Sequence, residues 1–326
     1  MDRKQGSLEK LNTSDKNRLL LIGGTGFIGT HIAKKGISLG FEVSIISKNS
    51  KPNLEKINGV EYFNININDH AELSHQINNK IFHYVINLCG YIDHSNYFNN
   101  GEKVIDDHFN GIRNIVNCIN RTNLITFIQV GSSDEYGNNP APQGENLREL
   151  PISPYSFAKT ASTHFLQMLY LTENFPSVIL RPFLVYGPGQ GRSRFIPQII
   201  NGCLENSDFS VSQGEQLRDF CFIDDIVNAV FLSLNNSNLY GEVINIASGE
   251  AVSIKEVVVL IQKIIGAGSP KFGQISYRAG ENMALYADTS KAKNLLNWSS
   301  KITLKEGLKR TIEYQKNHFL SNTLIK

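Results

Sequence analysis

A tyrosine and a lysine stand four residues apart in the segment "SPYSFAKTASTHF", at Tyr155 and Lys159. In a helix these positions share one face, so the ammonium would lie beside the phenol. A free tyrosine has a pKa of about 10 and exchanges protons poorly at neutral pH. A nearby cation would stabilise the phenolate and lower this pKa. The spacing therefore predicts a tyrosine that can act as a general acid/base near neutral pH.

Two carboxylates stand in the segment "GSSDEYG", which follows a strand-like run. Asp134 and Glu135 could be a working acid/base pair or part of a polar turn. In an extended segment, successive side chains face opposite ways, so only one of the two could point into a site. We expect Glu135 to be an exposed turn acid.

A glycine-rich turn joins a strand-like run to a helical pattern in "LLLIGGTGFIGTHIAKKG". Its glycines fit G-x-G-x-x-G, and the helix that begins near Phe27 offers free N–H groups and the positive end of its dipole to a pyrophosphate. This arrangement predicts a dinucleotide site at the first strand–helix turn. The residues expected to contact the cofactor there are Gly23, Gly26, Phe27, Ile28 and Gly29.

The second strand-like run ends at Ser47, followed by Lys48. NAD-preferring sites usually carry an acid at the end of this strand, where it accepts the ribose hydroxyls. A serine and a lysine would instead attract a 2′-phosphate, although Lys48 could also be an ordinary solvated lysine. We therefore expect NADP(H) in preference to NAD(H). Asn66 and Ile67, placed at the end of the third run, are expected neighbours of the adenine.

Strand-like runs alternate with helical patterns through the first two-thirds of the chain. The runs are apolar on both faces, which is typical of a parallel sheet covered by helices on both sides. They span residues 18–23, 42–47, 62–67, 84–90, 126–131 and 177–183. The fold class predicted is therefore α/β, a doubly wound parallel sheet of the Rossmann type.

The regular alternation stops after "VYGPGQG" at residue 191. We expect a Rossmann domain from 18–185 and 220–247, in which "GEVINIAS" rejoins the sheet. A smaller, discontinuous lobe from 186–219 and 248–326 would cover the strand ends, where ligands bind in open α/β sheets. Residues 1–17 are expected to form a flexible tail.

The bulk properties exclude several classes of partner. The formal net charge of +2 over 326 residues gives no reason to expect nucleic acid or an anionic membrane. No apolar run approaches the ~18 residues of a membrane span, and the charged N-terminal stretch lacks the apolar region of a signal peptide. The four cysteines have no metal-ligand spacing, so we expect reduced thiols, no metal and a cytoplasmic location.

With these motifs in place, the chain resembles the extended short-chain dehydrogenase/reductases, in the branch that acts on nucleotide-diphosphate sugars. The likeness runs from Arg18 to about His318 through "GGTGFIG", "NLCG", "GSSDEYG", "SPYSFAK", "RPFLVYGPGQ", "LRDFCFIDDI" and "YRAGENMALYADTSKAKNLLNW". It implies that Ser132 is the catalytic hydroxyl that holds the sugar oxygen and that Tyr155 is the acid/base. It also implies that Lys159 binds the nicotinamide ribose and lowers the pKa of the tyrosine.

The same resemblance implies further contacts. The cofactor would be lined by Leu88, Cys89, Gly90, Pro182 and Val185, and the substrate by Ser133, Asp134 and Arg218. Arg218 would meet the diphosphate, or it would otherwise form a surface salt bridge. Two asparagines of the family are replaced in this chain. Leu184 replaces the first, so one expected polar contact to the substrate is missing. His108 replaces the second, which would either alter a local hydrogen-bond relay or simply cap differently.

The position of the acids favours one reaction within the family. The 4,6-dehydratases carry a glutamate two residues before the tyrosine of this motif, whereas the shorter Asp134 stands there in this chain. Because one missing methylene withdraws the carboxylate, "GSSDEYG" resembles the 4-keto-6-deoxyhexose reductases more closely. We therefore expect NADPH-dependent reduction of a nucleotide-diphosphate 4-keto-6-deoxyhexose. The alternatives are an NAD-dependent nucleotide-sugar 4-epimerase, then a 4,6-dehydratase, and last a non-catalytic, cofactor-sensing scaffold.

The resemblance also implies a homodimer in which the helices at 106–120 and 155–171 form a four-helix bundle. The apolar residues Phe165, Met168, Leu169 and Leu171 on the second helix cover more than one stripe. Such a pattern indicates burial on two sides, either against a second subunit or within the chain.

Overall fold

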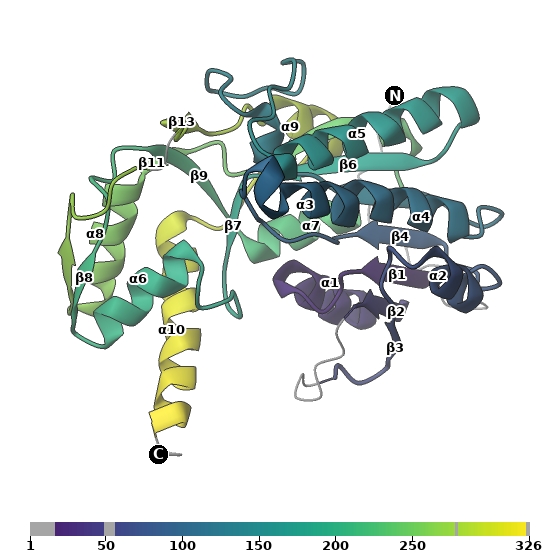
Figure 1. The fold of residues 1–326 in the computed structure, drawn as a ribbon. Helices are drawn as coiled ribbons and strands as arrows, with labels where there is room; N and C mark the ends of the chain where they lie inside the picture. The colour runs from purple at the N-terminus through teal and green to yellow at the C-terminus, as the bar shows by residue number, and fades with distance from the viewer. Residues whose placement is uncertain (1–16, 49–55, 278–279, 324–326) are drawn as a thin grey trace, which may run out of the picture.

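The computed structural model describes residues 17–48, 56–277 and 280–323. All but the last residue of the predicted tail lies outside the described residues. Seven parallel strands form the large sheet, in the order β10-β6-β5-β4-β1-β2-β3 (Figure 1). They are β1 (Arg18–Ile22), β2 (Glu42–Ser47), β3 (Val60–Asn64), β4 (Tyr84–Asn87), β5 (Thr126–Val130), β6 (Ser177–Pro182) and β10 (Val243–Ile246). The predicted fold class, a doubly wound α/β sheet, is confirmed.

The strands of the sheet bury side chains on both faces, except the edge strand β3, in which no side chain is fully buried. In β1, Leu19 and Leu21 belong to one apolar cluster, and Leu20 and Ile22 belong to the other. The first cluster lies under α1 (Phe27–Ser38) and α7 (Ile223–Ser233), and the second under α2 (His70–Ile77), α4 (Gly111–Cys118) and α5 (Pro154–Glu173). This two-sided burial explains why the runs are apolar throughout rather than alternating.

The boundaries of two elements differ from the predicted ones. β3 ends at Asn64, so Asn66 and Ile67 follow the strand instead of ending it. The helix expected over 106–120 is divided into a π-helical turn η2 (Asp106–Asn110) and α4, and a short helix α3 (Glu102–Ile105) precedes it. The wider turn contains the buried His108, and π turns of this kind often occur beside functional sites.

A second group of elements lies beside the sheet, at the left in Figure 1. β7 (Leu184–Tyr186) and β13 (Ala284–Leu285) pair in parallel with β9 (Leu217–Phe222), and β11 (Ala251–Ser253) pairs with it in antiparallel fashion. β8 (Asp208–Ser210) pairs with β12 (Ser269–Lys271). The helices of this group are α6 (Phe195–Leu204), α8 (Ile254–Ile265) and α10 (Leu304–Thr323), whereas α9 (Ser290–Leu296) contacts β10 of the large sheet (Figure 1).

The chain then returns to the large sheet. "GEVINIAS" contains β10, whose Val243 pairs with Ile179 of β6, so the predicted return of this segment is confirmed. All four cysteines are free thiols, and three of them are buried, while Cys89 is half-buried. Within the described ranges, no helix combines the length and apolarity needed to cross a bilayer.

Candidate active site

The glycine turn after β1 is shaped by close backbone approaches. Gly23 has a φ of +78°, and a Cβ there would lie 3.0 Å from the backbone nitrogen of Cys89. A Cβ on Gly29 would lie 2.5 Å from the Cα of Gly24, so only glycine lets the turn and the helix meet. α1 begins at Phe27 without a side-chain cap and without an acid in its first turn. The exposed N–H groups and the open glycine cradle fit the pyrophosphate of a dinucleotide.

The carboxyl ends of β2 and β3 flank this turn. The Ser47 hydroxyl lies 2.9 Å from the Thr25 hydroxyl, which binds the end of β2 to the glycine turn. Lys48 is exposed. Asn66 and Ile67 follow β3, and the Ile67 carbonyl accepts a hydrogen bond of 3.0 Å from Asn114. The four residues predicted for the adenosine half of a cofactor thus lie at neighbouring strand ends.

An acid absent from the predictions lies near Lys48. Asp107 of η2 accepts hydrogen bonds from Asn68 at 2.7 Å and from Tyr91 at 3.0 Å, and pairs with Lys103 at 2.5 Å. Partial burial opposes the ionisation of Asp107, but these hydrogen bonds and the charges of Lys103 and Lys48 lower its pKa overall. The positive charge of Lys48 is therefore partly offset by a carboxylate on a different element.

The loop after β4 carries Leu88, Cys89 and Gly90. Gly90 has a φ of +132° and packs against the His108 ring, where a Cβ would lie 2.2 Å from the ring carbon Cε1. Burial and the charge of Lys159 lower the pKa of His108 to about 3, so this ring is neutral near pH 7. His108 therefore replaces the family asparagine as an uncharged, buried ring.

The three predicted catalytic residues converge at the end of β5. Lys159 donates hydrogen bonds to the carbonyls of Val130 at 3.0 Å and Cys89 at 3.5 Å, so its ammonium bridges the ends of β4 and β5. The ammonium lies 5.9 Å from the centre of the Tyr155 ring. Tyr155 and Lys159 are each 5% exposed, and Ser132 hydrogen-bonds the tyrosine.

The pKa of Tyr155 does not follow the expected direction. Burial raises it, the Asp134 and Glu135 carboxylates raise it further, and the hydrogen bond with Ser132 opposes the rise only in part. Burial lowers the pKa of Lys159. The protein alone therefore favours the phenol. A cationic nicotinamide would act in the opposite direction, because an opposite charge nearby favours the ionised form.

The two carboxylates of "GSSDEYG" have different environments. This segment is a short 3-10 helix, Ser133–Tyr136, and Ser132 caps it by accepting a hydrogen bond of 3.2 Å from the Asp134 amide. Asp134 faces His94 at 3.9 Å, and its side chain is 30% exposed. Glu135 is fully buried, so the expectation of an exposed turn acid is wrong. The helical turn, rather than an extended strand, directs its side chain inward.

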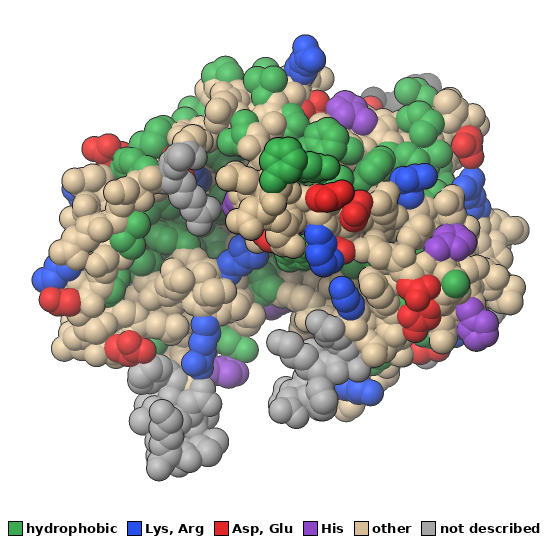
Figure 2. Space-filling view, viewed as in Figure 1, with side chains coloured by type: hydrophobic (Ala, Val, Ile, Leu, Met, Phe, Trp, Pro, Cys, Tyr) green, Lys and Arg blue, Asp and Glu red, His purple; other side chains and the backbone are tan. Residues whose placement is uncertain are grey.

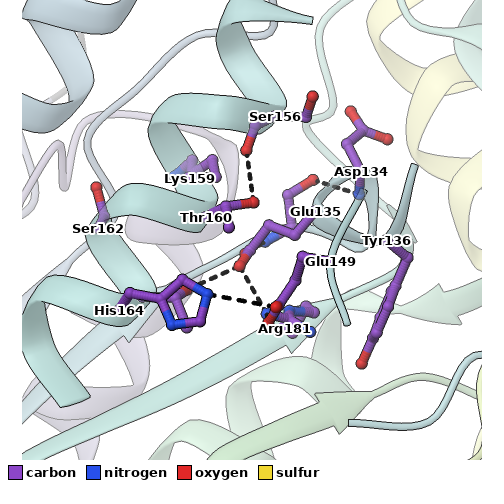
Figure 3. A network of polar contacts seen from close by, with 12 residues as sticks. Asp134, Glu135, Tyr136, Glu149, Ser156, Lys159, Thr160, Ser162, His164 and Arg181 are labelled. Carbon is purple, nitrogen blue, oxygen red and sulfur yellow. Dashed lines mark hydrogen bonds and ion pairs between the residues drawn. The ribbon is translucent and has the colours of Figure 1, made fainter. Parts of the chain in front are cut away.

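A buried network surrounds Glu135 (Figure 3). Its Oε2 accepts hydrogen bonds from Arg181 and Thr163, each at 2.7 Å, and its Oε1 accepts from the Ser132 amide at 2.8 Å. Arg181 also donates to Glu149 at 3.0 Å. No spacing in the sequence indicates this network, because Arg181 lies 46 residues after Glu135.

The remaining predicted residues are more dispersed. Ser133 is only 4% exposed, so little of it could contact a substrate. Pro182 ends β6, and Val185 lies in β7, where its carbonyl accepts a hydrogen bond of 2.7 Å from Gln190. Arg218 of β9 is mostly buried and pairs with Glu281 rather than forming an exposed surface contact.

His94 is a further residue that the sequence reasoning missed. Its ring lies 5.8 Å from that of Tyr155 in an edge-on arrangement, while His108 lies 5.3 Å from the same ring. Two histidines therefore flank the tyrosine. The position of His94 just after "NLCG" was the only available signal, since this loop was predicted to follow the cofactor. Within the part of the chain that the structure describes, no group of three or more metal-ligating side chains converges.

Comparisons with known proteins agree with this geometry. A putative UDP-glucose 4-epimerase of Methanocaldococcus jannaschii is 31% identical over 310 residues, covering 92% of this chain and 99% of that protein. The crystal structure of a Thermotoga maritima UDP-glucose 4-epimerase with UDP-glucose has a TM-score of 0.86 at 26% identity, covering 93% and 99% of the two chains. A Bacillus cereus UDP-glucuronic acid 4-epimerase with UDP-glucuronic acid and NAD has a TM-score of 0.83 at 26% identity, covering 92% and 99%.

The family described as "NAD dependent epimerase/dehydratase family" matches residues 19–247, which is more than half of the chain. The match spans the glycine turn, Ser132, Tyr155 and Lys159, so the resemblance inferred from the sequence is confirmed. The chain belongs to the NAD dependent epimerase/dehydratase family and is an enzyme of the extended short-chain dehydrogenase/reductase type.

Proposed function

We propose that the protein interconverts the C4 epimers of a UDP-hexose with NAD held in the glycine cradle. The observation that carries this proposal is the convergence of Ser132, Tyr155 and Lys159 at one sheet edge, beside the glycine turn. The relatives add support, because three of those most similar to this chain are described as 4-epimerases. Reduction of a 4-keto sugar, the reaction expected from the sequence, is the weaker candidate.

The residues that would hold the dinucleotide are the glycines of the turn for the pyrophosphate and Lys159 for the nicotinamide ribose. Bound NAD would supply a hydride acceptor and donor. Tyr155 would accept the proton of the C4 hydroxyl and hold it while C4 is a carbonyl. Ser132 would hold the sugar oxygen in hydrogen-bond range of the phenol. The proton would return from Tyr155 to the same oxygen after the hexose has turned its other face.

A 4,6-dehydratase is disfavoured by the carboxylates. Glu135, the longer acid, already accepts three hydrogen bonds, from the Ser132 amide, Thr163 and Arg181. Asp134 is one methylene shorter than the family glutamate, and misplacement by about 1 Å can cost ~100-fold in rate. The site is therefore better suited to chemistry at C4 alone.

NAD is proposed in place of the expected NADP. In the sequence, Ser47 and Lys48 favour NADP(H). In the structure, the Ser47 hydroxyl lies against the Thr25 hydroxyl, and the Asp107 carboxylate partly offsets the charge of Lys48. A 2′-phosphate would therefore meet a carboxylate as well as an ammonium. Neighbouring structures with NAD bound support the same choice.

Arg218 is proposed to meet the diphosphate of the substrate. It lies on β9, and in Figure 2 the surface is hollowed between the part of the molecule that contains β9 and the part that contains α1. A bound diphosphate would compete with Glu281 for the guanidinium, so binding would require this ion pair to rearrange.

We also propose a homodimer in which the segment 106–120, which contains η2 and α4, packs together with α5. Met168 is 44% exposed, Leu171 is 79% exposed and Phe157 is 50% exposed, and they follow one stripe of α5 at helical spacing. The alternative, that this face is covered within the chain, does not apply to these three residues. Sedimentation of wild-type protein and of Met168→Glu tests the proposal: a dimer that Met168→Glu dissociates supports it, and a wild-type monomer at micromolar concentration contradicts it.

The proposed reaction is tested with purified protein and no added cofactor. UDP-glucose or UDP-galactose is supplied, and the products are identified by NMR, while the dinucleotide released by heat denaturation is identified by chromatography. Formation of the C4 epimer together with released NAD supports the proposal. Turnover of only a 4-keto-6-deoxyhexose, with consumption of NADPH, would replace it with the reductase.

A further inference from the structure

We propose that Glu135 is a positioning residue that holds Ser132 in register with the helix carrying Tyr155 and Lys159. The inference rests on the proposed function in that Ser132 and Tyr155 are taken as the reacting pair. In this role the Glu135 carboxylate does not itself contact the substrate. The evidence lies in the two oxygens of that carboxylate, which bind two different elements.

The first oxygen fixes the segment after β5. Glu135 Oε1 accepts the Ser132 amide at 2.8 Å, and Ser132 Oγ in turn accepts the Asp134 amide. Together these bonds form a reciprocal cap around one short turn. A Cβ on Gly131 would lie 2.5 Å from the same Oε1, so this glycine leaves room for the carboxylate. The backbone of Ser132 is therefore held directly by Glu135.

The second oxygen reaches α5. Glu135 Oε2 accepts the Thr163 hydroxyl at 2.7 Å, and Thr163 stands four residues after Lys159, one turn along the same helix. Figure 3 shows the carboxylate between this helix and the turn that contains Asp134. The carboxylate thus links the turn with the catalytic hydroxyl to the helix with the phenol and the ammonium.

Arg181 holds the buried carboxylate in one orientation. Its Nη2 donates to Glu135 Oε2 at 2.7 Å, and both side chains are fully buried. The guanidinium also lies 4.5 Å over the ring of Tyr136, which packs beneath it. A buried ion pair is weak evidence for stability, because desolvation opposes the attraction. A geometric role explains its presence better.

The same network offers a matched control. Glu149 also pairs with Arg181, at 3.0 Å, and with His164 at 3.3 Å, but it contacts neither Ser132 nor Thr163. Glu135→Gln and Glu149→Gln remove the same charge from the same arginine. Only the first removes an acceptor from the catalytic segment, because an amide has one oxygen and cannot serve Ser132, Thr163 and Arg181 together.

The first readout requires no substrate, so it remains informative even if the proposed epimerisation is wrong. Hydrogen–deuterium exchange of the segment 130–136 is compared in both variants and in the wild type. We expect faster exchange at Ser132 in Glu135→Gln and wild-type exchange in Glu149→Gln. Equal exchange in all three proteins overturns the inference.

The second readout is kinetic. We expect Glu135→Gln to lower kcat by roughly 10- to 100-fold, as for a misplacement of about 1 Å, with KM changed less than about 3-fold. Removing this carboxylate also removes one cause of the raised pKa of Tyr155, after burial and Asp134. Because Tyr155 accepts a proton in the proposed reaction, it must start as the phenolate, so the acidic limb of the kcat profile should move to lower pH. Glu135→Gln leaves unchanged the other titratable groups around Tyr155 and Lys159. They are Asp134, Arg194 and Cys89, together with the flanking His94 and His108.

Three kinetic outcomes would overturn the inference. They are a kcat within 2-fold of wild type in Glu135→Gln, an equal loss in Glu149→Gln, or an unshifted acidic limb. If Glu135→Gln does not fold, the kinetics of Thr163→Val are measured instead. This substitution removes only one hydroxyl donor from Oε2 of Glu135. A loss in kcat of about 3-fold or more at unchanged KM supports the inference, and wild-type kcat overturns it.

Discussion

The catalytic end and the adenosine end of the sheet edge are built differently. At the catalytic end, Tyr155 and Lys159 are 5% exposed and Glu135 is fully buried. At the adenosine end, Lys48 is exposed and only partly offset by Asp107. A buried group has few alternative positions, whereas an exposed charge is screened by water and salt. We therefore expect the folded core to determine the reaction and a few solvated charges to determine the choice of cofactor.

The largest effect is expected at the phenol of Tyr155. Tyr155→Phe removes the group that exchanges the proton, and general acid–base catalysis typically contributes about 10²- to 10⁴-fold. We expect a loss in kcat within this range and an unchanged circular dichroism spectrum. If Tyr155→Phe retains more than a tenth of wild-type kcat, the catalytic end does not act as described.

Ser132→Ala should have the next largest effect. The variant loses the hydroxyl that holds the sugar oxygen, and we expect kcat to fall by roughly 10- to 100-fold. Burial raises the pKa of Tyr155 and the Ser132 hydrogen bond opposes that rise, so losing this bond should move the acidic limb of the pH profile to higher pH. Ser38→Ala, which changes an exposed serine at the end of α1, is the matched control. An acidic limb that stays in place would show that Ser132 does not act on the phenol.

His108 should make the catalytic end sensitive to acid. Its pKa is about 3 in the folded chain because burial and Lys159 disfavour the charged ring, whereas an unfolded histidine has a pKa of about 6.5. Between these values the unfolded chain binds a proton that the folded chain does not, so stability falls as pH falls below about 6.5. At pH 5.5 the expected loss from this group is about 1.4 kcal/mol.

Urea unfolding of wild type and His108→Asn at pH 7.5 and 5.5 measures this loss. The asparagine cannot be protonated, so the variant should lose less stability than the wild type over the same interval. Equal losses in the two proteins would show that His108 is not a neutral ring in the folded state.

The smallest effect is expected at Lys48. Lys48→Glu reverses an exposed charge, so its influence on a 2′-phosphate is screened by solvent. We expect the Kd for NADP to rise by about 3- to 10-fold and the Kd for NAD to change less than 2-fold, measured by calorimetry with cofactor-free protein. Lys34→Glu, on the exposed face of α1, controls for the change in net charge. A large and equal loss of both cofactors would mean that Lys48 contacts a group common to them.

Local spacing was sufficient to predict part of the site. The glycine turn, and Tyr155 with Lys159, each lie within one strand–helix junction or one helix turn, so sequence distance determines spatial distance. The expected boundaries of β1, β2 and α1 are close to the observed ones for the same reason.

Other features depend on contacts between distant segments. Glu135 was expected to be exposed, but Arg181, 46 residues later, draws it into the core. Arg218 was assigned to a diphosphate, yet it pairs with Glu281, 63 residues later. The family resemblance supplied the candidate reacting residues, while relatives described as 4-epimerases favour epimerisation over the expected reduction. Both reactions would use Ser132, Tyr155 and Lys159, so these three residues do not distinguish epimerisation from reduction.

The central claim is that hydride leaves and returns to C4 of one bound hexose while Tyr155 holds the proton. It is tested most directly with UDP-glucose deuterated at C4, incubated with the purified protein in ordinary water and followed by NMR. We expect UDP-galactose that retains deuterium at C4, because the hydride never exchanges with solvent. A C4 epimer that has lost the deuterium to water, or the absence of any C4 epimer, would contradict the account.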